Sequence, residues 1–190
     1  DLNDGMFHSA DNREGMEFSA SGNGARLIVN TAMAAEARAI SQLAAEQGDL
    51  WLSNVFSQKA LLLEKNIKDK LWNEHVNFFT TRKDNGEQSV VREIQGFSPW
   101  YFGQSLKGKY ACCWNFLTNA DHFMGKYGLT SVDRSDSNYK IVYEGHPCQW
   151  NGPSWPYTTS MTLTALANAI RLGESGSLGA GDFVRLLRQY

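Results

Sequence analysis

Two long stretches with helical periodicity follow one another directly, and this arrangement restricts the fold more than any other feature of the chain. Residues 27–47 are rich in Ala and Leu, and their small and apolar side chains recur at steps of three and four, as on one face of a helix. Gly48 and Asp49 interrupt this pattern, and residues 52–72 then resume it. The two stretches therefore predict a pair of helices with a tight connection, which is a helical hairpin.

Further helices are predicted in the second half of the chain. One follows Pro156, with Thr158 or Thr159 as its N-cap. Shorter helices are expected around 98–104 and 110–119, and the last helix is expected to begin at Asp182.

The segment around residues 78–95 alternates apolar and polar residues about an Asp-Asn-Gly turn, and is predicted to be one β-hairpin or a long irregular arm. The predicted fold is therefore mainly all-α. It is a single domain over 1–190 in which helical hairpins pack side by side, with function on the loops of one face.

Composition excludes several classes of function. The formal charge is −2 with no long block of either sign, which argues against nucleic-acid and membrane-surface partners. No apolar run approaches the roughly 18 residues that suggest a membrane-spanning helix. Three cysteines do not make a disulfide framework; one disulfide from Cys148 to Cys112 or Cys113 and three buried thiols both remain open. The scattered histidines give no metal-binding spacing.

Aromatic residues are frequent, and many of them lie in segments with the composition of loops. In "CQWNGPSWPY", Pro153 and Pro156 restrict the backbone and Gly152 permits close approach to a neighbour or ligand. Trp150 and Trp155 are therefore expected on a stiff frame. The neighbouring polar groups come from His146, Gln149 and Asn151. Flat aromatic faces beside such groups suit a sugar, although a peptide groove uses similar materials.

Two other segments carry candidate functional groups. In "REGMEFSASGNGAR", Glu14 and Glu17 lie near Met16 and Phe18, whose apolar side chains can favour a protonated general acid. Taken alone, both glutamates are more simply explained as solvated loop carboxylates.

In "VVREIQGFSPWYFG", Arg92 and Glu93 precede an aromatic group that includes Trp100 and Tyr101. Strand alternation predicts that Arg92 and Glu93 point to opposite faces, so that one of them is structural. At least one of the aromatic residues is expected to belong to the core.

Taken together, "EGMEFS" and "WNGPSWP" resemble motifs of the six-hairpin (α/α)6-toroid glycosidases. The similarity is to the glycoside hydrolase family 63-like group, with its mannosylglycerate hydrolases and processing α-glucosidases, and more distantly to trehalases. The resemblance extends from about Gly15 to Tyr190. It places Glu17 at the general acid, where the family has Asp, and Trp150, Gly152, Pro153 and Trp155 on the pocket wall. Asn151 stands where Arg is more usual.

The resemblance implies an inverting hydrolase of α-linked glucosides or mannosides that uses a water nucleophile. It also implies that the general base follows Tyr190, so that this chain is a fragment of the catalytic domain. The remainder of that domain is then a possible partner, and Glu144 and Glu93 are fallback candidates for the base. The residues expected to contact an oligosaccharide or small glycoside are Trp150, Asn151, Gly152, Trp155, Trp100, Tyr101, Arg92, Glu93, Glu144, His146 and Phe18.

No cofactor is expected. Calcium occurs in some relatives, and Asp133 and Asp136 are acidic residues that such a site would use, but their loop lacks the spacing of a dedicated site. A secreted or periplasmic location is inferred from the polysaccharide chemistry. The alternatives are a non-catalytic carbohydrate-binding or scaffold protein of the same fold, and a helical module whose aromatic loops bind peptide.

Overall fold

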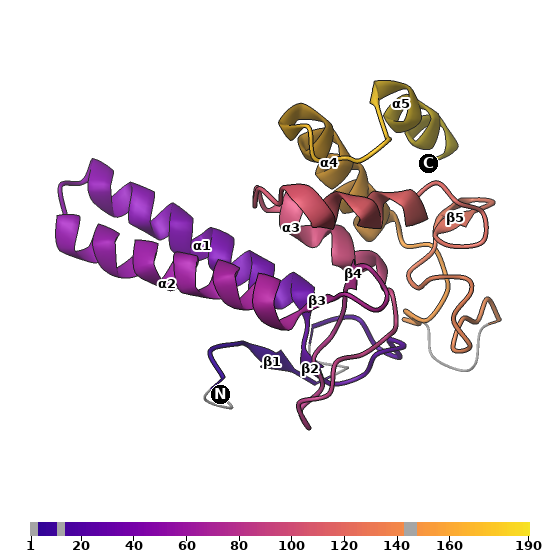
Figure 1. Cartoon of the computed structure of the whole chain (residues 1–190), viewed down its shortest axis with the longest axis horizontal. Helices are drawn as coiled ribbons and strands as arrows, with labels where there is room; N and C mark the ends of the chain where they lie inside the picture. Colours follow the sequence, from indigo (N-terminus) through magenta and orange to yellow (C-terminus); the bar gives the residue numbers. More distant parts are fainter. Residues whose placement is uncertain (1–3, 11–13, 143–147) are drawn as a thin grey trace.

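The computed structural model describes residues 4–10, 14–142 and 148–190. Its longer helices form two groups, with the irregular segments beneath and between them (Figure 1). The helices are α1 (Leu27–Glu46), α2 (Leu50–Lys70), α3 (Ser98–Tyr101), α4 (Pro156–Leu172) and α5 (Ala180–Gln189), and the 3-10 helices are η1 (Ile94–Phe97) and η2 (Gly108–Phe116). The strands are β1 (His8–Ser9), β2 (Gly24–Ala25), β3 (Trp72–Asn73), β4 (Phe78–Phe79), β5 (Met124–Gly125) and β6 (Gly128–Leu129).

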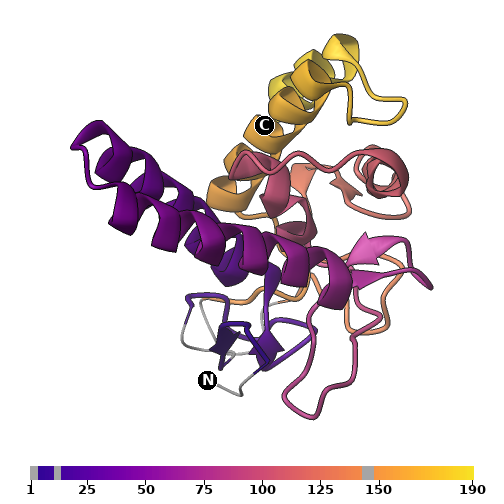
Figure 2. The same cartoon turned by 60° about the vertical axis from the view of Figure 1, so that its left-hand side comes forward.

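The predicted helical hairpin is confirmed: α1 and α2 pack antiparallel along their lengths and project from one side of the molecule (Figures 1 and 2). Asp49 caps α2 by accepting a hydrogen bond from the backbone N–H of Leu52 at 2.9 Å. Helix α2 ends at Lys70, two residues before the predicted end, because the next residues turn into strand β3.

Helix α4 begins at Pro156, and the prediction of Thr158 or Thr159 as its N-cap is wrong. Proline is favoured at the first helical position because its missing N–H would have no partner there. Both threonines are buried inside the helix. The last helix begins at Ala180, two residues before the predicted start, and Asp182 accepts a hydrogen bond from the backbone N–H of Gly179.

The predicted hairpin around 78–95 is instead an irregular arm, the second of the two predicted forms. Strand β4 pairs with β3, and the arm then forms single antiparallel bridges from Arg82 to Gln88 and to Ala25. Two more short antiparallel pairs, β1 with β2 and β5 with β6, were not predicted. Strands of two residues are too short to produce a recognisable alternation in the sequence.

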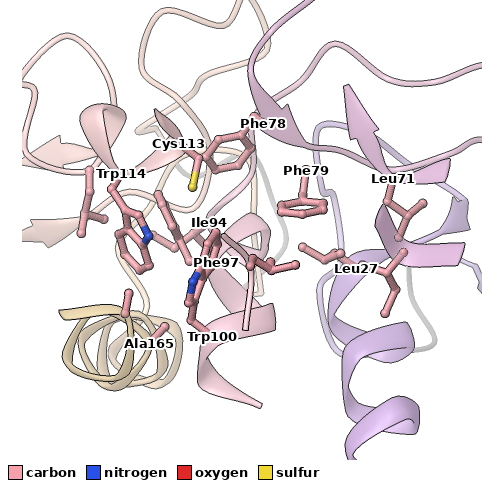
Figure 3. Packing of buried hydrophobic residues seen from close by; sticks show 14 of the residues in the cluster. Leu27, Leu71, Phe78, Phe79, Ile94, Phe97, Trp100, Cys113, Trp114 and Ala165 are labelled. Atoms are coloured by element: carbon pink, nitrogen blue, oxygen red, sulfur yellow. The ribbon is translucent and has the colours of Figure 1, made fainter. Parts of the chain in front are cut away.

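A cluster of fully buried aromatic rings lies between the arm and α4, and we call it the aromatic core (Figure 3). Its rings are those of Phe78, Phe97, Trp100, Trp114 and Phe123. The ring centroids of Phe97 and Trp114 are 4.6 Å apart in a stacked arrangement, and those of Phe78 and Phe97 are 5.2 Å apart edge to face. Gly96 is required here because a Cβ at that position would lie 2.1 Å from the Phe78 ring.

Candidate functional site

Four segments that are distant in the sequence meet beside the N-terminal ends of α1 and α4. They are residues 14–26, 92–95, 130–133 and 149–155. The backbone N–H of Trp150 donates to the carbonyl of Glu17 at 3.1 Å, which joins the first segment to the last. Ser131, in the third segment, connects the second segment to the last: its carbonyl accepts from Ile94 N–H at 2.9 Å, and its N–H donates to the Pro153 carbonyl at 3.2 Å. The two motifs of the sequence analysis are therefore adjacent.

A cleft of about 330 Å³ opens at this junction, within the size range of small-ligand sites. Its walls come from residues 14–16, which directly precede Glu17, from the first turns of α1 and α4, and from the aromatic side chains Phe102, Trp150 and Tyr157. Tyr157 was not predicted as a site residue, and its only sequence signal is its place directly after the proline that starts α4. A larger hollow of about 520 Å³ lies elsewhere, between residues 5–8 and the α1–α2 hairpin.

The two tryptophans of the second motif stack on each other. Their ring centroids are 4.8 Å apart and the rings are within 8° of parallel, so a sugar does not fit between them. Trp150 is buried and lines the cleft, and Trp155 packs behind it, with its indole N–H donating to the Gln149 carbonyl at 2.9 Å. The predicted pair of pocket walls is thus a single wall two rings thick.

Gly152 and Asn151 have distinct local roles in this loop. A Cβ on Gly152 would lie 1.8 Å from the carbonyl oxygen of Lys140, so the close neighbour predicted for this glycine is the backbone. The side-chain oxygen of Asn151 is buried and accepts no hydrogen bond from the described residues. Asn151 does not line the cleft, so its role as a sugar contact stays a prediction.

Glu17 is half-buried on the neighbouring loop, and one of its carboxylate oxygens is fully buried. A side-chain hydrogen bond with Glu17 is the main reason why the pKa of the Cys148 thiol is raised, and burial adds to the effect. Cys148 also lies 3.8 Å from the Gly15 carbonyl through its sulfur. All three cysteines are free thiols, as one of the two open interpretations expected, but only Cys113 is buried.

Phe18 follows Glu17 with a backbone φ of 58°, in the left-handed region. A bulky residue with positive φ is an outlier that persists only where its surroundings enforce it, and such residues are enriched at functional sites. Its side chain is 54% exposed and does not line the cleft, so its role as a sugar contact stays a prediction.

Glu14 and Glu93 lie at the two sides of Arg26 in what we call the charged cluster (Glu14, Arg26 and Glu93). Arg26 is fully buried, with its Nε 2.5 Å from Glu14 Oε1 and a terminal nitrogen 3.8 Å from Glu93 Oε1. Arg26 was not predicted as a functional residue, since a lone arginine before a helix has no distinguishing pattern. Glu93 is buried in these contacts and does not reach the surface as a sugar contact or a base.

Arg92 points away from Glu93, as strand alternation predicted. Its guanidinium donates to Asp133 at 2.8 Å and to the Val76 carbonyl at 3.0 Å, and lies 4.0 Å from the Phe116 ring centroid. Burial raises the pKa of Asp133, but hydrogen bonds from His122, Ser135 and Arg92 outweigh this effect and hold the pKa below its usual value.

Trp100 does not fit its predicted role as a sugar contact, because it is fully buried in the aromatic core. Its indole N–H donates to Glu174 at 3.0 Å. Tyr101 is half-buried and packs edge to face on Phe102, beside the cleft. The predicted residues Glu144 and His146 lie outside the described residues.

Within the described ranges, no cluster of three or more His, Cys, Asp or Glu side chains is arranged to hold a metal ion. Asp133, considered for calcium, is already bonded to its protein partners. No helix in the part of the chain that the structure describes has both the length and the apolar character needed to span a bilayer.

Solved structures of (α/α)6-toroid glycosidases share the fold of this chain. A mannosylglycerate hydrolase from Thermus thermophilus, solved with glucose, has a TM-score of 0.67 at 18% identity over 88% of this chain and 36% of its own. The neutral trehalase of Saccharomyces cerevisiae has a TM-score of 0.62 at 16% identity, over 80% of this chain and 29% of its own.

The chain belongs to the mannosylglycerate hydrolase MGH1-like glycoside hydrolase domain family, whose model matches residues 2–190. A solved structure named as a sialidase is also similar, with a TM-score of 0.92 and 29% identity over 97% of this chain. The chain spans 17% of that sialidase and about a third of the mannosylglycerate hydrolase. No curated protein matches the sequence.

Proposed function

We propose that these residues form the acid side of a glycosidase site that hydrolyses α-linked glucosides or mannosides with inversion. The observation that carries the proposal is the hydrogen bond from Trp150 N–H to the Glu17 carbonyl. Through this bond, the segment with the aromatic wall lies directly beside the segment with the carboxylate. Glycosidase family membership supports the reaction class. One structural relative was solved in complex with glucose, which supports a sugar ligand.

In the proposed reaction, Glu17 donates its proton to the glycosidic oxygen as the bond from that oxygen to the anomeric carbon breaks. Water attacks the anomeric carbon from the opposite face and loses its proton to a second carboxylate. Inverting enzymes place the two carboxyl groups about 6.5–9.5 Å apart so that the water fits between them. Glu93 is not assigned as that second group, because Ser21, Gln95 and Arg26 occupy its oxygens.

The aromatic wall gives the sugar its binding surface in this proposal. Trp150 presents a flat face to the apolar C–H groups of a pyranose.

Hydrolysis of α-glucosides and α-mannosides by the intact protein, before and after Glu17→Gln, tests the proposal. We expect kcat to fall by about 10²–10⁴-fold, the usual contribution of a general acid. Glu46→Gln, an exposed glutamate at the end of α1, is the matched control. An unchanged rate would show that Glu17 is not the general acid. The stereochemistry is tested separately: NMR of the first sugar anomer released by the wild type shows whether hydrolysis proceeds with inversion. Sugar binding without hydrolysis in the wild type supports the carbohydrate-binding alternative.

A further inference from the structure

Residues 14–26, which include Glu17, are held by ion pairs and hydrogen bonds to the buried side chains of Arg26 and Glu93. Arg26, at the end of this stretch, is 2.5 Å from Glu14 at its beginning and 3.8 Å from Glu93 on the irregular arm. A guanidinium taken out of water is costly unless carboxylates surround it in good geometry. The three side chains therefore hold one another in a fixed arrangement.

Glu93 is itself held by the middle of the same stretch. Ser21 approaches it twice, through its backbone N–H at 3.3 Å from Oε1 and through its hydroxyl, which donates to Oε2. Gln95 donates to Oε2 at 2.8 Å, and the side-chain oxygen of Gln95 accepts from Ile28 N–H at 3.4 Å in the first turn of α1. The arm, the loop and the start of α1 are thus joined through one carboxylate.

Glu17 lies between the two anchor points, Glu14 and Ser21. The backbone in this interval is unusual at Phe18, whose φ is 58°. The left-handed conformation of a phenylalanine needs the rest of the structure to enforce it. The contacts of Glu14 with Arg26 and of Ser21 with Glu93 supply that constraint.

We propose that Arg26 and Glu93 are positioning residues for the general acid: by fixing Glu14 and Ser21, they fix where the Glu17 carboxyl lies. The inference rests on the proposed function, in which Glu17 is the acid. Neither residue touches the substrate. Their effect on the reaction therefore passes through proton delivery to the leaving group.

Arg26→Lys and Glu93→Gln in the intact protein test this role. Lysine keeps the charge but loses the fork that reaches two carboxylates. For an alkyl α-glycoside, which needs a proton on its leaving oxygen, we expect kcat to fall about 10–100-fold with KM within about twofold, as for a misplaced catalytic group. For the matching glycosyl fluoride, whose leaving group needs little protonation, the loss should be below about threefold.

The control is Arg185→Lys on α5, which alters an exposed ion pair with Asp182 at 2.9 Å and lies far from β2 and the charged cluster (Figure 1). It should leave both substrates unaffected. In a Glu17→Gln background, Arg26→Lys should cause no further loss, because the two residues act as one unit. Equal losses on both substrates, or full additivity with Glu17→Gln, overturn the proposal.

Hydrogen exchange separates this result from a failure of the proposed function. If Glu17→Gln leaves hydrolysis unchanged, the acid assignment fails, and the anchor is measured by the amides of residues 14–22. These should exchange at least about tenfold faster in Arg26→Lys while α1 and α2 keep their protection. Unchanged protection of this stretch overturns the anchor as well. If Arg26→Lys does not fold, Ser21→Ala, which removes one hydroxyl donor from Glu93, replaces it. The same changes in kcat and in amide exchange are then expected, but smaller.

Discussion

The aromatic core and the charged cluster are both buried, yet they are built from opposite chemistry. The aromatic core removes large apolar surfaces from water, a gain that depends little on direction. The charged cluster removes a guanidinium and two carboxylates from water, which yields little net stability even when their geometry is good. The comparison indicates a division of roles: the aromatic core stabilises the domain, and the charged cluster fixes the geometry of one loop.

Trp114→Ala gives the largest expected loss, because it breaks the aromatic core directly. Trp114 is fully buried and stacks on Phe97. We expect the free energy of unfolding to fall by about 3–5 kcal/mol, as for other buried aromatic truncations. Denaturant titration measures it, with Trp51→Ala, 74% exposed at the start of α2, as a control that should change stability by less than about 0.5 kcal/mol.

Arg26→Met tests the other side of the comparison. Removing one partner leaves two buried carboxylates without their cation, and we expect a loss of about 3 kcal/mol in the free energy of unfolding, measured by the same titration. Adding Glu14→Gln and Glu93→Gln should recover part of this loss, because no uncompensated charge then remains in the cluster. A triple variant that is less stable than Arg26→Met would show that the ions themselves stabilise the fold.

Glu174→Gln tests a single carboxylate inserted in the aromatic core. Glu174 accepts from the Trp100 indole at 3.0 Å, from Leu106 N–H at 2.7 Å and from the Ser105 hydroxyl. Glutamine keeps the shape but replaces one acceptor with a donor, so we expect a loss of about 1–3 kcal/mol. The melting temperature reports it, and no change would mean that the amide rearranges without leaving a donor unsatisfied.

Asp133 is a buried carboxylate outside both clusters, and it makes the stability of the fold depend on pH. Its folded-state pKa is lowered, so its contribution is complete above the unfolded value of about 3.9 and is lost as pH falls through the folded pKa. Asp133→Asn should therefore lower stability at neutral pH and flatten the acid limb of the stability curve below about pH 4, as measured by denaturant titration across this range. Asp121→Asn, at an exposed position, should leave that limb intact.

Phe18→Asn is expected to have the smallest effect and to be stabilising. Asparagine tolerates the left-handed region better than phenylalanine, and relief of this strain should raise the free energy of unfolding by about 0.5–1 kcal/mol. Thermal melts measure the gain. A loss of stability would indicate that the exposed ring makes contacts worth more than the strain.

The long elements were predictable because their signals are local. Helices α1 and α2 follow from periodicity within about 20 residues each, and the stiff loop at Trp150 follows from its prolines. Trp100 was assigned to the wrong environment, because its Gly- and Pro-containing neighbours indicate a loop and cannot report a partner such as Glu174. Arg26 was missed for the same reason, since its meaning depends on Glu93, which only the fold brings near.

The charged cluster has a consequence for how sequences of this kind can diverge. A single replacement of Arg26, Glu14 or Glu93 leaves a buried charge without compensation, so intermediate sequences are penalised. The three positions should therefore vary together or not at all, as a linked set rather than as independent sites. Substitution one residue at a time is expected to be tolerated on the exposed face of α2 and blocked at these three positions.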